Sequence, residues 1–211
     1  MVGLRKRIKG MMLSEMTTVP GASLPVQGLK DHLRLGTGFT EDGMQDGLIE
    51  AYLRAAIAAV EGRIGKVLLA RRFKLVLEDW RTPGEQPLPV APVSGIVSVT
   101  VVDVADVAEA ASVVDPGRYR LVPDMHRPKL AALGVLLPVV PMDGRAEVVF
   151  DAGFGATWAE VPVDLAQAVM LLAAEYYEIR QPGEGAQPGL PFAVQALIER
   201  WRTVRILGGK A

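Results

Sequence analysis

Apolar residues follow two different spacings along the chain, and each spacing predicts one kind of element. Toward both ends they recur every three or four positions, which is the spacing of one face of a helix. The clearest stripe begins after Thr40, Glu41 and Asp42, which supply a cap and negative charge at a helix start. Pro25 and Pro162 suit the first turns of two other helices. Helices are therefore expected over 25–35, 41–66, 162–181 and 190–204.

Between the second and third of these helices the spacing changes to two, which is typical of strands with one buried face. Phe73, Leu75 and Leu77 show it first, because they alternate with a lysine, a valine and a glutamate. Proline cannot donate to a strand ladder, so the proline-rich stretch 83–92 is expected at an edge or between strands. Further strands are expected at Val97–Val102, Tyr119–Val122 and Glu147–Phe150. Together these segments predict an antiparallel β module over 69–151.

The order of these elements predicts an α+β fold, in which a small bundle of about four helices carries an inserted antiparallel β module. We expect one domain over 24–204, preceded by a flexible basic N-terminus at 1–23 and followed by a C-terminal tail at 205–211. The N-terminal segment does not read as a signal peptide, because its apolar run breaks at Ser14 and Glu15. It is expected to be a disordered tail, or residues upstream of a start at Met11 or Met12.

The composition excludes sites built on cysteine and argues against several other classes of function. The chain has 211 residues and no cysteine, so disulfides, thiol nucleophiles and cysteine metal sites are excluded. Its formal net charge of −1 gives no general attraction to nucleic acid or to a membrane surface. It contains no run of 18 apolar residues, and we expect no membrane span.

No residue pattern predicts an enzyme, a cofactor site or a metal site. His32 and His126 lack the spacing of metal ligands. Gly153-Phe154-Gly155 lies between a strand and a helix, as in a dinucleotide-binding turn, but Trp158 occupies the place of the third glycine. A turn that needs positive φ explains both glycines more simply. Glu175 and Glu178 are expected on a solvated helix face.

The C-terminus is the strongest candidate for a binding segment. Its last twelve residues contain four cations and no acidic side chain, with one tryptophan and two large aliphatic residues between them. Arginine and tryptophan often anchor interfaces, and cations also bind nucleic-acid phosphates. A basic helix end that suits its own dipole is the plainer explanation. The candidate residues are Arg200, Trp201, Arg202, Arg205, Ile206, Leu207 and Lys210.

A series of motifs in a fixed order extends over 24–201. It begins with Leu29–Arg34 and the 48–66 helix, and continues through Arg71–Leu75, 87–99 and Tyr119–Leu121. It ends with Phe150–Gly155, Val161-Pro162, Tyr176–Arg180 and Leu190-Pro191-Phe192. This order resembles that of the head–tail connector (adaptor) proteins of tailed phages and of phage-derived gene transfer agents.

The resemblance implies a structural protein of a phage or gene transfer agent particle, assembled in bacterial cytoplasm. Its subunits would form a ring, usually dodecameric, beneath the capsid portal, with DNA passing through the channel without sequence-specific binding. The ring would carry the next neck or tail protein, and the tail from Trp201 to Ala211 would dock on the portal. The alternative is a nucleic-acid-binding packaging factor that uses the basic termini. Neither function involves a cofactor or a membrane.

Overall fold

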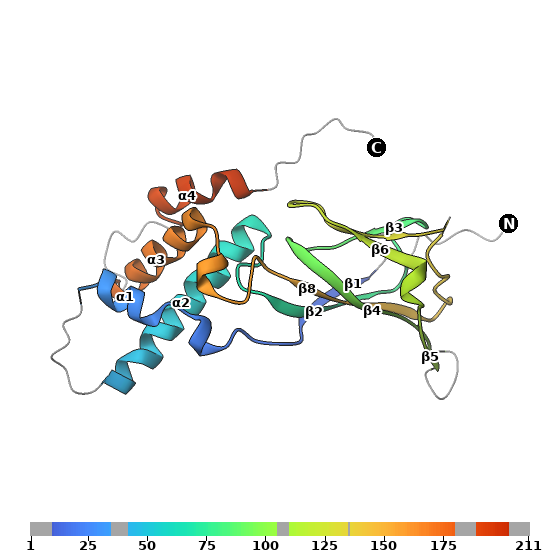
Figure 1. Cartoon of the computed structure of the whole chain (residues 1–211), viewed down its shortest axis with the longest axis horizontal. Coiled ribbons are helices and arrows are strands. Elements are labelled where there is room, and N and C mark those ends of the chain that lie inside the picture. Colours follow the sequence, from blue (N-terminus) through green and yellow to red (C-terminus); the bar gives the residue numbers. More distant parts are fainter. Residues whose placement is uncertain (1–9, 35–41, 105–109, 135, 180–188, 203–211) are drawn as a thin grey trace. The chain divides into compact units, whose positions relative to one another are not determined.

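The computed structural model describes residues 10–34, 42–104, 110–134, 136–179 and 189–202, which form two compact units. Met1–Thr18 and Arg71–Gly153 belong to the β unit, and Val19–Ala70 and Phe154–Ala211 belong to the helical unit. Figure 1 shows the strands of the first and the helices of the second. The α+β class is confirmed, with four α-helices and two antiparallel sheets among the described residues.

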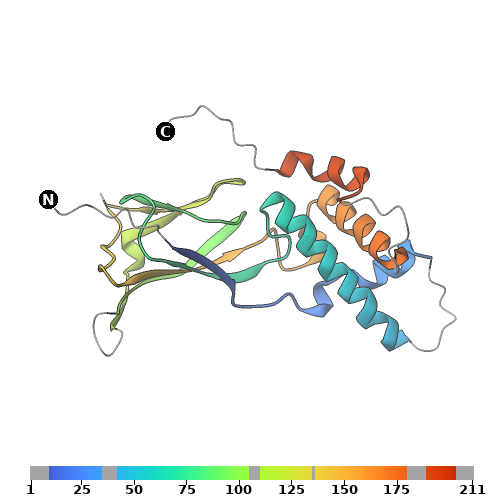
Figure 2. The ribbon, with the colours of Figure 1, turned by 180° about the vertical axis from the view of Figure 1, so that it is seen from behind.

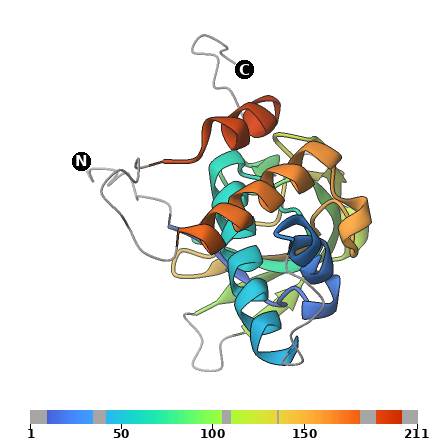
Figure 3. The same ribbon diagram turned by 90° about the vertical axis from the view of Figure 1, so that its left-hand side faces the viewer.

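The helical unit is built on α2 (Asp42–Ile64) and α3 (Val163–Glu178), which pack against each other (Figure 3). The short α1 (Val26–His32) contacts both, and α4 (Phe192–Ile198) lies against α3. The rings of Tyr52 and Tyr177 meet edge to face, with centroids 6.0 Å apart. The shared core is aliphatic, as the apolar stripes predict, and includes Leu53, Ala56, Val60, Leu165, Val169 and Leu172.

The helices are shorter than the periodicity predicts at most ends. Gly65, with φ of 67°, closes α2 directly after Ile64, because glycine adopts this conformation without strain. The last helix ends at Ile198 and tightens into a 3₁₀ turn over Glu199–Trp201. No described helix is long and apolar enough to cross a membrane.

The β unit contains a five-stranded and a three-stranded sheet, both antiparallel (Figures 1 and 2). The larger has the order β1 (Met11–Glu15), β2 (Arg71–Leu77), β8 (Arg145–Ala152), β4 (Val93–Asp103) and β5 (Ala110–Val113). The smaller has the order β3 (Glu85–Pro87), β7 (Lys129–Ala132) and β6 (Tyr119–Val122). Proline-containing β3 lies at an edge, in agreement with the sequence.

The two faces of the larger sheet differ in chemistry, as alternation requires. On the buried face, the rings of Phe73 and Phe150 stack across β2 and β8 with centroids 5.8 Å apart. On the other face, Glu147 forms ion pairs with Lys74 at 2.5 Å and with Arg145 at 2.8 Å. Burial alone would raise the pKa of Glu147, but hydrogen bonds from Arg145 and Lys74 outweigh it and hold that pKa below its usual value.

The N-terminal segment corrects the expected disorder over 1–23. Residues 11–15 form β1, which pairs with β2 over its whole length. Leu13 lies opposite buried Leu75, so β1 extends the sheet and its apolar face. The β unit therefore contains the N-terminal strand β1 in addition to most of the stretch predicted over 69–151. Its second segment runs from Arg71 to Gly153. Residues 1–9 lie outside the described residues.

The predicted alternation of Val97, Val99 and Val101 fails at Val97. The register of β4 against β8 shifts between Ile96 and Ser98, which marks a bulge or irregularity. One extra residue reverses the faces of those that follow. Consequently Val97 is 43% exposed, whereas Val99 and Val101 lie opposite the buried Val148 and Ala146, and Val99 is itself buried.

Candidate functional site

The turn that leads into α3 explains the two glycines around Phe154. Gly153 has φ of 138°, so the positive-φ explanation is confirmed there. The positive-φ explanation is wrong for Gly155, where a side chain has no room. An added Cβ would overlap Cβ and Cδ of Glu160 and lie 2.5 Å from its Oε2. This close approach accounts for a glycine without any phosphate ligand.

Glu160 closes the same turn. Its Oε2 accepts hydrogen bonds from the backbone N–H of Thr157 at 2.8 Å and from the Thr157 hydroxyl at 2.9 Å. These bonds favour the charged carboxylate and lower the pKa of Glu160. The turn ends at Pro162, and Val163 begins α3, which places Asp164 in the first turn of that helix.

Replacing Gly155 by alanine is expected to lower the free energy of unfolding by about 1–3 kcal/mol, because the new methyl group overpacks against Glu160. Gly62→Ala is the matched control. Gly62 is exposed within α2, and an added Cβ would meet nothing within 4 Å. That substitution should raise stability by about 0.5–1 kcal/mol. Urea denaturation of both variants measures the difference, and equal effects would show that Gly155 is not sterically required.

The C-terminal corner of the helical unit contains Phe154, Asp164, Arg200 and Trp201. The indole N–H of Trp201 donates to Oδ2 of Asp164 at 2.7 Å. The rings of Trp201 and Phe154 meet edge to face, with centroids 5.4 Å apart. Trp201 thus joins the end of the described chain to α3 and to the turn that precedes it.

One predicted arginine, Arg200, belongs to this corner, and a second, Arg202, lies beside it in sequence. Nε of Arg200 lies 2.6 Å from Oδ2 of Asp164, and its guanidinium lies 4.8 Å from the centre of the Trp201 ring. Arg202 pairs with Glu199 at 2.9 Å. Arg200, Trp201 and Arg202 therefore all make contacts within the subunit. Arg205, Ile206, Leu207 and Lys210 lie outside the described residues.

Asp164 and Phe154 are the partners that sequence reasoning did not identify. Asp164 also accepts a hydrogen bond from the N–H of Leu165 at 3.0 Å, so its carboxylate bonds both to its own helix and to Trp201. An acidic residue two positions after a helix-starting proline can be recognised in the sequence, because it complements the helix dipole. Its contact with Trp201 could not be recognised, because the two residues are 37 positions apart.

The two histidines are the remaining polar candidates. Among the described residues, no group of three or more His, Cys, Asp or Glu could hold a metal ion. Asp124 accepts hydrogen bonds from the backbone N–H groups of His126 and Arg127, which shapes the loop around that histidine. His32 lies in the last turn of α1.

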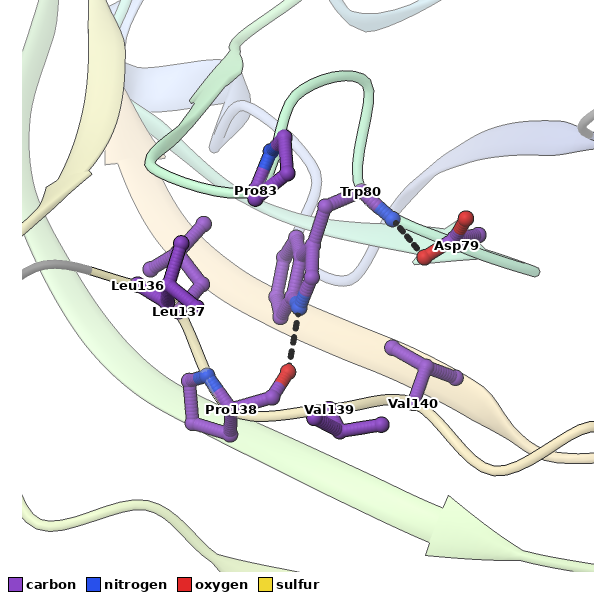
Figure 4. A pocket seen from close by; sticks show the side chains of 8 residues that line it. All are labelled: Asp79, Trp80, Pro83, Leu136, Leu137, Pro138, Val139 and Val140. Atoms are coloured by element: carbon purple, nitrogen blue, oxygen red, sulfur yellow. Dashed lines mark hydrogen bonds between the residues drawn. The ribbon is translucent and has the colours of Figure 1, made fainter.

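The β unit exposes an apolar loop between β7 and β8 (Figure 4). The indole N–H of Trp80 donates to the carbonyl of Pro138 at 2.6 Å and holds the loop over a small pocket. Val139 and Met142 are 84% and 83% exposed. Among the described residues that line this pocket, Asp79 is the one ionisable residue. A surface of this kind suits a protein contact better than chemistry.

No protein-family model and no curated protein matches the chain. A structure described as the neck of an empty gene transfer agent (GTA) particle, computed with C6 symmetry, is 55% identical with a TM-score of 0.84. The match covers 95% of this chain and all of that one.

Two further structures agree. A chain from the virion of a native GTA particle is 56% identical with a TM-score of 0.80, covering 94% of this chain and 98% of that chain. A chain from the neck of a native GTA particle, computed with C12 symmetry, is 52% identical with a TM-score of 0.79. That match covers 95% of this chain and 100% of the other. The chain therefore belongs to the head–tail connector (adaptor) family of tailed phages and gene transfer agents.

Proposed function

We propose that this protein is a structural adaptor of the particle neck, which forms a ring beneath the capsid portal. The observation that carries the proposal is identity above 50%, over nearly the whole chain, to proteins from GTA necks. The C12 symmetry of one of those necks supports a ring of twelve copies. Such a ring extends the DNA channel and carries the next neck or tail protein.

The proposed mechanism is geometric, and each subunit acts as a rigid wedge in a ring of heterologous contacts. The helical unit supplies rigidity through its aliphatic core, and the C-terminal corner fixes where the tail leaves α4. The tail residues Arg205, Ile206, Leu207 and Lys210 are proposed to contact the portal. Exposed apolar side chains of the β7–β8 loop fit a second protein contact.

Electron microscopy of the full chain mixed with its cognate portal tests the proposal. We expect a second ring on the narrow end of the portal, with its symmetry visible directly. Absence of added density, with both proteins folded by circular dichroism, would contradict an adaptor function.

A nucleic-acid-binding packaging factor is the alternative, and the observation that favours it is charge. The first ten residues contain four cations and no acidic residue, as do the last twelve. A factor that neutralises several phosphates loses affinity for duplex DNA steeply as salt rises. We expect weak binding of the isolated subunit to duplex, since Arg200 and Arg202 already pair with Asp164 and Glu199.

A further inference from the structure

Within the part of the chain that the structure describes, the five-stranded sheet has two open edges, β1 and β5. An open edge presents backbone N–H and C=O groups that another strand can pair with. Because four strand spacings of about 4.8 Å separate the two edges, they lie about 19 Å apart and cannot pair with each other within one subunit. A partner for either edge must come from elsewhere.

The outward-facing residues of β1 follow from its register with β2. The N–H of Met16 donates to the carbonyl of Arg72, and the N–H of Glu78 donates to the carbonyl of Gly10. Residues of an antiparallel strand alternate between facing the partner and facing away. The backbone groups of Met11, Leu13 and Glu15 therefore point away from β2, and the Met11 side chain is 58% exposed.

The outward-facing residues of β5 follow from its register with β4. The N–H of Val114 donates to the carbonyl of Val99, so alternate residues counted back from Val114 face β4. The backbone groups of Ala111 and Val113 point away from β4, and Val113 is 71% exposed. Met11 and Val113 carry no charged side chain that would protect these edges, although Glu15 ends β1.

We propose that β1 of one subunit pairs with β5 of the neighbouring copy, so that the sheet continues from subunit to subunit around the ring. This inference rests on the proposed function, because it requires a ring. In a sheet of five antiparallel strands the first and the fifth run in the same direction. Rotation about an axis along the strands keeps that direction, so the new pair is parallel. Opposite edges of one sheet also provide the two different surfaces that a head-to-tail ring needs.

Charge on the flanking sequence favours this partner over an unrelated strand. The ten residues up to Gly10 contain four cations and no acidic residue. The stretch 101–117, which includes β5, contains four acidic residues and no cation. The sequences that flank the two edges therefore carry opposite charge, and attraction between them favours a neighbouring copy as the partner.

Cross-linking tests the contact directly, because the natural chain has no cysteine to interfere. Met12→Cys and Ala111→Cys replace the second residues of β1 and β5, which are exposed on the same face of the sheet and lie side by side in a parallel pair. They are made singly and together in the full chain, and each variant is treated with a short bis-maleimide in the presence of the cognate portal. The double variant should give a ladder of covalent multimers up to the complete ring. A mixture of the two single variants should stop at dimers, and each single variant alone should give none.

Proline substitutions test the backbone pairing. Met11→Pro and Val113→Pro each remove one outward N–H and leave the bonds to β2 and β4 in place, which edge strands tolerate. We expect the concentration needed for ring assembly on the portal to rise at least tenfold. Met11→Thr and Val113→Thr keep the N–H and should assemble within about twofold of the wild type.

The outcomes separate this inference from the proposed function. A wild-type ring on the portal without subunit cross-links, together with proline variants that assemble normally, overturns the edge contact and leaves the adaptor function standing. Cross-links from either cysteine to the portal, in place of a second copy, also overturn it. If the wild-type chain forms no ring on the portal, the proposed function fails and this inference fails with it.

Discussion

Deletion of residues 206–211 is expected to leave a folded subunit that binds the portal at least about 100-fold more weakly. The deletion removes Ile206 and Leu207, and burying one large aliphatic side chain at an interface contributes about 1.5–3 kcal/mol. Two such contacts correspond to a factor of 100 or more in the dissociation constant. The aliphatic core of the helical unit lies within residues 19–198, so the melting temperature of the truncated protein should equal that of the wild type.

Surface plasmon resonance with immobilised portal rings measures this loss. The matched control replaces residues 206–211 by six glycine and serine residues, which keeps the length of the chain and removes its apolar side chains. Both variants should lose binding equally. Retention of affinity by the glycine–serine variant would show that chain length matters and that Ile206 and Leu207 do not. Undiminished binding by the deletion would exclude the tail as the portal anchor.

The strands that could be predicted are those with one buried face. In β2 and β8 every second residue is buried, and the period of two is visible without knowledge of the partner strand. Met11–Glu15 has no such alternation, because an edge strand of five residues buries little of its surface. Its strand conformation depends on pairing with β2, about 60 residues later, and that long-range contact leaves no local signal.

A similar distinction applies to the C-terminal corner. Composition pointed to Arg200, Trp201 and Arg202, because cations and tryptophan stand together without acidic neighbours after Glu199. What these side chains contact could not be predicted, since Asp164 and Phe154 lie far away in the sequence, with Asp164 37 residues before Trp201. Two of the three contact Asp164 or Phe154, and the third pairs with Glu199. Their first role is therefore to hold the tail at a fixed point, which a portal contact would then use.

Replacing Trp201 by alanine is expected to lower the free energy of unfolding by about 2–4 kcal/mol, because it removes the ring contact with Phe154 and the hydrogen bond to Asp164. Loss of this anchor also frees the start of the tail. Binding to the portal must then order more of the chain, so we expect the dissociation constant to rise about tenfold. Urea denaturation and portal binding, measured on the same samples, give the two values.

Trp201→Phe distinguishes an anchor from a direct portal contact. Phenylalanine keeps an aromatic ring against Phe154 but is smaller and lacks the indole N–H, so stability should fall by about 1–2 kcal/mol. An anchored tail should then bind the portal within about twofold of the wild type, because the position of the tail is retained. If Trp201→Phe weakens portal binding as much as Trp201→Ala, the indole itself touches the portal. In that case Asp164 orients Trp201 for its contact with the portal. Asp164→Ala should then weaken portal binding as Trp201→Ala does, although the indole ring is kept.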